Sequence, residues 1–168
     1  MTALIPVVVA GALGRMGAEV IRAVQGAEDC TLVGAIDNTP GKEGCDIGLE
    51  LGLGELEVAI TADFEGCLCA VSQSVRDSDS GAVLVDFTHP SVVYEHTRAA
   101  IAYGVHPVIG TTGLSPEQLS DLSQFSAKAS IGGAVIPNFS VGMVLLQQAA
   151  AAAARFYDHA ELTELHHN

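Results

Sequence analysis

The sequence predicts an α/β protein built on a doubly wound parallel sheet. Over the first 137 residues, short apolar runs rich in valine and isoleucine alternate with longer segments of helical periodicity. The short runs are apolar throughout, which is typical of parallel strands that helices cover on both faces. A glycine-rich turn joins the first such run to the first helical segment.

The first elements form one βαβ unit. Residues 5–10 (IPVVVA) predict a buried strand, 14–24 a helix and 31–37 (TLVGAID) a second strand, which together fill about the 30 residues that such a unit needs. The stretch 38–56, rich in glycine and acidic residues, is expected to be a surface loop.

The following elements continue the alternation. Strands are expected at 82–87, 105–110 and 129–137, and helices at 91–104 and from 115 to about 129. The last helix has the clearest start signal, because Ser115 can act as N-cap, a proline occupies the first helical position and a glutamine the capping-box position.

The pattern changes after Pro137. An alanine-rich helix is expected at about 140–157, and Leu162 and Leu165 then show strand-like alternation. One helix and one strand cannot bury a core of their own. The sequence therefore predicts a complete first domain, residues 1–137, followed by the beginning of a second in residues 138–168.

Composition argues against several kinds of partner. The 168 residues include 20 acidic and 7 basic side chains, for a net charge of −13. Such a surface repels phosphates, so neither nucleic acid nor an anionic membrane is expected as a partner. The apolar segment 141–154 is too short to span a bilayer and contains two glutamines, which favours a buried helix.

The four cysteines predict no disulfide framework. Cys30, Cys45, Cys67 and Cys69 have no regular spacing, and no secretory leader precedes them, so reduced thiols in a cytoplasmic protein are expected. Cys67 and Cys69 could be half of a metal site, but no second pair completes it. A structural role is the simpler interpretation, and no metal is expected.

The turn GALGRMG has the features of a nucleotide loop. Gly11, Gly14 and Gly17 lie between a strand and a helix, where a tight turn and a free helix N-terminus can hold a pyrophosphate. An ordinary βα turn is the alternative. Asp37 ends the second strand at about the distance where a carboxylate accepts the ribose hydroxyls of adenosine, and the combination favours a dinucleotide.

The same carboxylate bears on which dinucleotide binds. A negative charge at Asp37 should repel a 2′-phosphate, which favours NADH over NADPH. Arg15, Asn38 and Lys42 are nearby groups that could soften this preference.

Four further stretches are more specific: VDFTHP (85–90), VIGTTGLS (108–115), IPNFSVGMVLL (136–146) and ELHHN (164–168). In this order after GALGRMG, they resemble the 4-hydroxy-tetrahydrodipicolinate reductase (dihydrodipicolinate reductase) family along the whole chain. The resemblance implies a Rossmann-like nucleotide domain followed by a mixed α+β domain for substrate binding and assembly of a homotetramer. It also implies reduction of a small anionic dicarboxylate by NADH or NADPH, in the diaminopimelate route to lysine.

The resemblance further implies roles for individual residues. The pyrophosphate would be lined by Gly11, Ala12, Leu13, Gly14, Arg15 and Met16, and Asp37 would contact the ribose. The nicotinamide half would be bordered by Gly110, Thr111, Thr112, Ile136, Pro137, Asn138 and Phe139, with Phe87 and His89 also near the cofactor. The threonines could instead belong to a plain loop after a strand, Asn138 could cap the next helix and Phe139 could simply pack.

Two adjacent histidines would complete the site. The resemblance implies that His166 donates and accepts the proton and that His167 contacts a substrate carboxylate, and an imidazole titrating near neutrality suits a proton transfer that accompanies hydride transfer. Because consecutive strand residues point to opposite faces, His167 is expected at a strand end. His96, His106 and His159 match no motif and are expected to be surface or core residues.

Family members continue past Asn168 to a lysine and a Ser-Gly-Thr segment that serve the substrate. The chain is therefore expected to be a fragment that binds the nucleotide but reduces substrate slowly or not at all. The residues also bear on two other functions. A noncatalytic NAD(H)-binding sensor would use the same glycine turn, whereas a short-chain dehydrogenase needs a Tyr-x-x-x-Lys pair that none of the three tyrosines forms.

Overall fold

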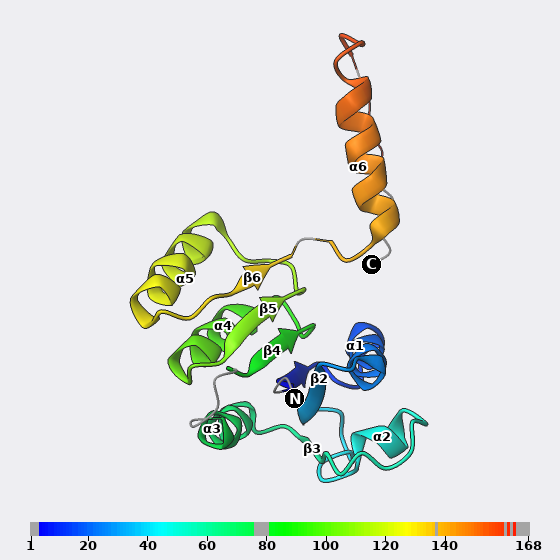
Figure 1. Ribbon diagram of the computed structural model, residues 1–168. Coiled ribbons are helices and arrows are strands. Elements are labelled where there is room, and N and C mark those ends of the chain that lie inside the picture. Colours follow the sequence, from blue (N-terminus) through cyan, green and yellow to red (C-terminus); the bar gives the residue numbers. More distant parts are fainter. Residues whose placement is uncertain (1–3, 76–80, 137, 160, 162, 164–168) are drawn as a thin grey trace. The chain divides into compact units, whose positions relative to one another are not determined.

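The computed structural model describes residues 4–75, 81–136, 138–159, 161 and 163. The chain divides into two compact units, residues 1–137 and 138–168. In the first unit, Figure 1 shows a central sheet with helices on both faces.

The sheet has six strands in the order β3-β2-β1-β4-β5-β6, and every neighbouring pair is parallel. The strands are β1 Ile5–Ala10, β2 Cys30–Ile36, β3 Ile60–Thr61, β4 Val83–Asp86, β5 His106–Ile109 and β6 Ala134–Val135. The chain winds outward from β1 in both directions, so the strand order reverses between β1 and β4. This arrangement confirms the predicted doubly wound, Rossmann-like fold.

The ladder between β1 and β2 contains one irregularity. Val7 lies opposite Leu32, but the next residue, Val8, lies opposite Gly34, so Val33 is an extra residue in β2. After this bulge the two strands stay in register to their last pair, Ala10 and Ile36.

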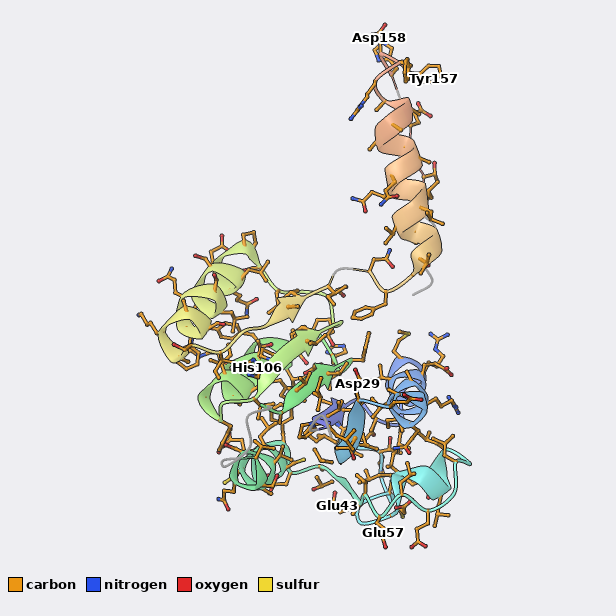
Figure 2. All side chains as sticks on the ribbon, viewed as in Figure 1. Asp29, Glu43, Glu57, His106, Tyr157 and Asp158 are labelled. Carbon is orange, nitrogen blue, oxygen red and sulfur yellow. The ribbon has the colours of Figure 1, made fainter. Side chains whose placement is uncertain are left out.

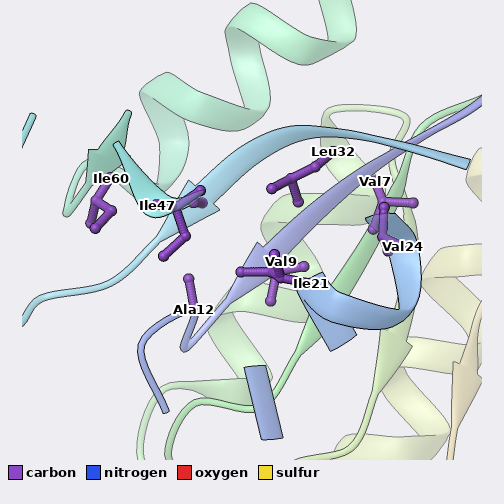
Figure 3. Close-up of a cluster of buried hydrophobic side chains, with 9 residues drawn as sticks. Val7, Val9, Ala12, Ile21, Val24, Leu32, Ile47 and Ile60 are labelled. Carbon is purple, nitrogen blue, oxygen red and sulfur yellow. The ribbon is translucent and has the colours of Figure 1, made fainter. Parts of the chain in front are cut away.

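Alternation along β1 divides the core between two layers of helices. Val7 and Val9 pack with α1 (Arg15–Gly26) and α2 (Ile47–Glu50) in the cluster of Figure 3, whose buried members are Val7, Val9, Ala12, Ile21, Val24, Leu32, Ala35, Ile47 and Ile60. Val8 and Ala10 point to the opposite face, where α3 (Phe64–Ser74) and α4 (Val93–Ala102) cover the sheet. The helix α5 (Pro116–Ala129) packs beside α4.

Helix α1 follows directly from the spacing of its small and apolar residues. Its buried face consists of Gly17, Ala18, Ile21 and Val24, which recur at the period of a helix. Ile21 is completely buried, and its truncation to alanine would cost about 2–5 kcal/mol.

The predicted capping box of α5 is confirmed. The Ser115 hydroxyl accepts the Gln118 N–H at 3.2 Å, and the Gln118 side chain accepts the Ser115 N–H at 2.9 Å. The strand expected at 129–137 was too long, because α5 continues to Ala129 and ends in a left-handed Ser130. Two glycines then delay the strand to Ala134–Val135.

The segment expected to be a surface loop contains more structure than its composition suggests. Asp46 caps α2 by accepting the Leu49 N–H, and it also accepts the N–H groups of Leu56 and Val58 at 3.1 Å each. Ile47 is completely buried. The Asp46 carboxylate therefore links the two ends of this segment, which its composition did not indicate. The short strand β3 and the helix α3 were also not predicted.

The acidic side chains are spread over the surface of the first unit. Asp29, Glu43 and Glu57 are all exposed on different segments (Figure 2). The four cysteines carry free thiols. Burial raises the pKa of the Cys67 thiol, which lies close to the backbone of Gly34 in β2, so its environment is that of a core residue.

The second unit contains α6 (Val141–Ala153), which ends four residues before the predicted boundary. Ser140 caps it by accepting the Met143 N–H at 3.4 Å. No residue of α6 is buried, and Val141 and Leu145 are 74% and 59% exposed. The prediction of a buried helix is therefore wrong for this structure. The strand-like pair Leu162 and Leu165 lies outside the described residues.

Candidate functional site

The glycine turn brings the start of α1 against the ends of two strands. The N–H groups of Gly11 and Ala12 both donate to the Ile36 carbonyl, at 2.9 and 3.1 Å, and the Gly14 N–H donates to the Gly11 carbonyl at 3.0 Å. Gly11 has a φ of +76°, and a Cβ there would meet the Phe87 carbonyl oxygen at 2.7 Å. A side chain cannot be placed at the centre of this turn.

Gly17 permits the closest approach in the turn. A Cβ on this residue would lie 2.0 Å from the Gly11 carbonyl oxygen, so α1 rests directly on the turn that precedes it. Gly14 is the N-cap residue of α1, so the helix starts without a side-chain cap. An uncapped N-terminus of a twelve-residue helix presents N–H groups and a positive dipole end to an anion.

Asp37 is tied to the glycine turn. Its Oδ2 accepts the Leu13 N–H at 2.9 Å, and its Oδ1 accepts the Thr39 N–H at 2.9 Å and the Thr39 hydroxyl at 2.6 Å. The carboxylate is half-buried at the end of β2. The structure therefore joins two features that are 24 residues apart in the sequence.

The ends of β4 and β5 adjoin the same turn. The Phe87 N–H donates to the Ala10 carbonyl at 3.0 Å, and the Gly110 N–H donates to the Asp86 carbonyl at 2.9 Å. The Phe87 ring lies so close to Gly110 that a Cβ there would be 2.2 Å from the ring. Residues after β1, β4 and β5 thus form one continuous surface at the carboxyl edge of the sheet, where such folds place ligands.

A buried carboxylate lies beneath that surface. Asp86 is 0% exposed, and its Oδ1 accepts the Thr88 N–H and hydroxyl and the Thr111 hydroxyl at 2.8, 2.6 and 2.9 Å. Its Oδ2 lies 3.0 Å from Nδ1 of His96. Burial by itself would raise the pKa of Asp86, but the hydrogen bonds from His96, Thr88 and Thr111 outweigh it and hold the pKa below its ordinary value.

A cleft of about 510 Å³ opens between the ends of β2 and β4. Its lining combines backbone, aromatic and polar groups: Gly11, Ile36, Asp37, Asn38, Ala62, Phe64, Thr88, His89, Ser91, Val92 and His96. Arg15 and Met16 line a separate hollow beside the N-terminus of α1. A hollow on each side of the glycine turn suits a ligand that is longer than the turn itself.

The structure collects the predicted residues only in part. The carboxyl edge of the sheet in the first unit holds most of them: Gly11 to Met16, Asp37, Gly110 and Thr111. Thr112 comes next in the chain and is exposed. The Ile136 N–H donates to the Ile109 carbonyl at 2.8 Å. Asn138 and Phe139 belong to the second unit. There the Asn138 side chain accepts the Ser140 N–H at 2.7 Å, whereas the helix cap is Ser140 itself. Pro137, His166 and His167 lie outside the described residues.

Sequence reasoning gave no role to His96 or Phe64, although both line the cleft. The sequence offered only a weak indication for His96: it lies ten residues after Asp86, the acidic end of β4, and in the first turns of the next helix. Among the residues that the structure describes, no three His, Cys, Asp or Glu side chains are arranged to hold a metal ion.

The strand order, the uncapped glycine turn and the acidic end of β2 place the protein in the class of Rossmann-like α/β folds. The WlbA dehydrogenase from Thermus thermophilus, solved in complex with NAD and UDP-GlcNAcA, shares this fold with a TM-score of 0.68 at 16% identity, over 89% of this chain and 47% of its own.

The particular family is shown by the sequence. A family profile described as "Dihydrodipicolinate reductase, N-terminus" matches residues 5–139, and the chain belongs to this family. A 4-hydroxy-tetrahydrodipicolinate reductase from Synechococcus sp. (strain CC9605) is 93% identical over all 168 residues, which cover 61% of that relative. The dipicolinate-bound dihydrodipicolinate reductase from Paenisporosarcina sp. TG-14 has a TM-score of 0.69 at 30% identity, over 92% of this chain and 55% of its own.

The match confirms the family resemblance drawn from the motifs. The chain spans about three-fifths of the length of its curated relatives, 61% for the Synechococcus protein. In the described part of the chain, no helix has both the length and the apolar character that crossing a bilayer requires.

Proposed function

We propose that this chain supplies the nucleotide-binding part of a 4-hydroxy-tetrahydrodipicolinate reductase, with residues 1–137 as the dinucleotide-binding domain and 138–168 as the beginning of the substrate domain. The observation that carries the proposal is the bond between the Leu13 N–H and Asp37 Oδ2, 2.9 Å long. It joins the turn suited to a pyrophosphate to the carboxylate suited to a ribose, so both adjoin one site. The name of the 93%-identical relative supports the reaction.

The residues present fit NADH or NADPH. Gly11 and Gly17 leave no room for side chains where the pyrophosphate would approach the backbone, and the uncapped start of α1 offers N–H donors. When bound, the cofactor would supply a hydride. The turn and Asp37 would hold its adenosine half, and the surface formed by Phe87, Gly110 and Thr111 would position the nicotinamide half.

We further propose a preference for NADH. The Asp37 carboxylate is held in place by Thr39 and Leu13, so it cannot easily turn away from a 2′-phosphate. Lys42, one of the cations that could offset its charge, pairs with Glu50 at 2.5 Å. Repulsion at the ribose should therefore act against NADPH.

The part of the proposal that concerns the substrate and the proton transfer rests on membership of the family. The substrate would be a small dicarboxylate, in keeping with the dipicolinate named in the Paenisporosarcina structure. His166 would transfer the proton and His167 would bind a substrate carboxylate, while Ile136, Pro137, Asn138 and Phe139 would border the nicotinamide. A cytoplasmic location and a homotetramer belong to the same proposal.

The proposal is tested by calorimetric titration of the chain with NADH and NADPH. Wild-type protein should bind NADH more tightly, and Asp37→Ala should weaken NADH binding at least about tenfold, because a hydrogen bond to a charged group is worth about 1.5–3 kcal/mol. Asp29→Ala is the matched control. It removes the same charge from an exposed site just before β2, at the other end of the strand that Asp37 follows, and should bind as wild type does.

Failure of the wild-type chain to bind either nucleotide would refute the proposal. Equal weakening by both substitutions would show that the position of Asp37 has no special importance for binding. Tighter binding of NADPH would refute the preference alone.

A further inference from the structure

His96 connects the wall of the cleft to the buried carboxylate beneath the site. Its ring stacks on Phe64 of α3, with centroids 3.9 Å apart and planes 10° from parallel. Its Nδ1 lies 3.0 Å from Oδ2 of Asp86, and its side chain is 19% exposed. The ring therefore contacts Phe64 through its face and Asp86 through Nδ1, and the same nitrogen lies 3.4 Å from the Thr88 hydroxyl oxygen.

The contact with Asp86 defines what His96 does there. An ionised carboxylate only accepts hydrogen bonds, so Nδ1 must carry the proton. The other oxygen, Oδ1, receives donors from Thr88, after β4, and from Thr111, after β5. Asp86 thus holds both strand ends in place, and the bond from His96 fixes the carboxylate from the opposite side.

We propose that His96 is a positioning residue for nucleotide binding: through Asp86 it fixes Thr88 and Thr111 at the strand ends that face the nucleotide. The inference rests on the proposed function. It assigns a role to a side chain that no motif singled out and that need not touch the reacting atoms.

The physical basis is the cost of leaving a buried charge without one of its donors. Asp86 is completely buried, so loss of the Nδ1–H cannot be made good by bulk water. The carboxylate would turn toward other donors, and the hydroxyls of Thr88 and Thr111 would move with it. These shifts occur at the edge of the cleft, because Thr88 itself lines it.

Two substitutions separate the two contacts of the ring. In His96→Asn the amide nitrogen falls close to the place of Nδ1, so the donor to Asp86 is kept while the stack on Phe64 is lost. In His96→Phe the stack is kept and the donor is lost. Positioning through Asp86 predicts that NADH binding survives in the first variant and weakens about tenfold in the second, which corresponds to 1.4 kcal/mol.

Thr97→Val provides the control for general damage to α4. Thr97 is buried next to His96, and its hydroxyl bonds to the Val93 carbonyl at 2.6 Å within the helix. This variant should lower the melting temperature without changing the dissociation constant for NADH. If His96→Phe does not fold, His96→Gln replaces it, because its amide nitrogen falls near Nε2 and also cannot serve Asp86.

Calorimetry with NADH, together with thermal unfolding of each variant, decides between the alternatives. Weak binding in His96→Phe and near-normal binding in His96→Asn supports the inference. Normal binding in His96→Phe overturns it, because the donor to Asp86 would then be unnecessary for binding. Equal weakening in both variants also overturns it, because keeping the donor would then fail to preserve binding. Absence of binding in the wild-type chain refutes the proposed function instead, so the two failures are distinguishable.

Discussion

Replacing Gly17 by alanine should damage both the stability of the fold and the nucleotide site. The added Cβ would lie 2.0 Å from the Gly11 carbonyl oxygen and 2.8 Å from its carbon, well inside the 3.4 Å at which ordinary contact begins. Both neighbours are backbone atoms, so relief requires that α1 and the turn separate. Overpacking of this kind costs about 1–3 kcal/mol, and contact with backbone places Gly17→Ala near about 3 kcal/mol.

The control is a second glycine of the same helix. Gly26 has no atom within 4 Å of its ideal Cβ, so Gly26→Ala should leave stability unchanged or raise it by about 0.5 kcal/mol through helix propensity. Urea unfolding should show a lower midpoint only for Gly17→Ala, and its melting temperature should fall by about 6–12 °C. NADH affinity should fall at least about tenfold in the same variant, because the helix N-terminus moves away from the strand end.

The reasoning would be refuted if both alanine variants unfolded at the same urea concentration. If Gly17→Ala is less stable but binds NADH normally, the predicted steric clash is supported. The predicted dependence of NADH binding on the glycine turn is then contradicted.

Three further outcomes are expected. Ser115→Ala should lower the free energy of unfolding by about 1 kcal/mol through loss of the capping box, measured by urea denaturation. Asp86 has a folded-state pKa below its ordinary value of 3.8, so its contribution to stability is complete above that value and is lost as pH falls through the folded-state pKa. Below about pH 4, the free energy of unfolding from urea denaturation should therefore fall with pH more steeply for wild type than for Asp86→Asn. Asp46→Ala should speed hydrogen exchange at the Leu56 and Val58 amides and leave the sheet amides unchanged.

The sequence was most informative where structure is determined locally. The strand, turn and helix around Gly11 follow from residues within about one βα unit, and Ser115 marks a helix start by its own spacing. Short elements that depend on distant partners could not be seen. β3 has only two residues and exists because it pairs with β2, and Asp46 reaches amides up to twelve residues away.

The candidate site shows the same limit. Asp37 was found because strand ends carry a known pattern, but its bond to Leu13 was not foreseeable from either residue alone. The role argued for His96 needs four elements, α3, α4, β4 and β5, to meet around Asp86. The assignments of His166 and His167 stay predictions that rest on the motif.

The bulge at Val33 has a consequence for how this family can tolerate insertions and deletions. Because Val33 has no partner in β1, the registers before and after it are set separately, and only the later one brings Ile36 level with Ala10. Removing Val33 would let β2 pair with β1 without a break. The one-residue change in register would then fall at one end of β2. A slip toward Asp37 would turn that carboxylate to the other face of the sheet, whereas a slip toward Cys30 would alter only the strand's beginning. Length variants that retain function should therefore show their differences at the start of β2 and keep its last three residues in phase with β1.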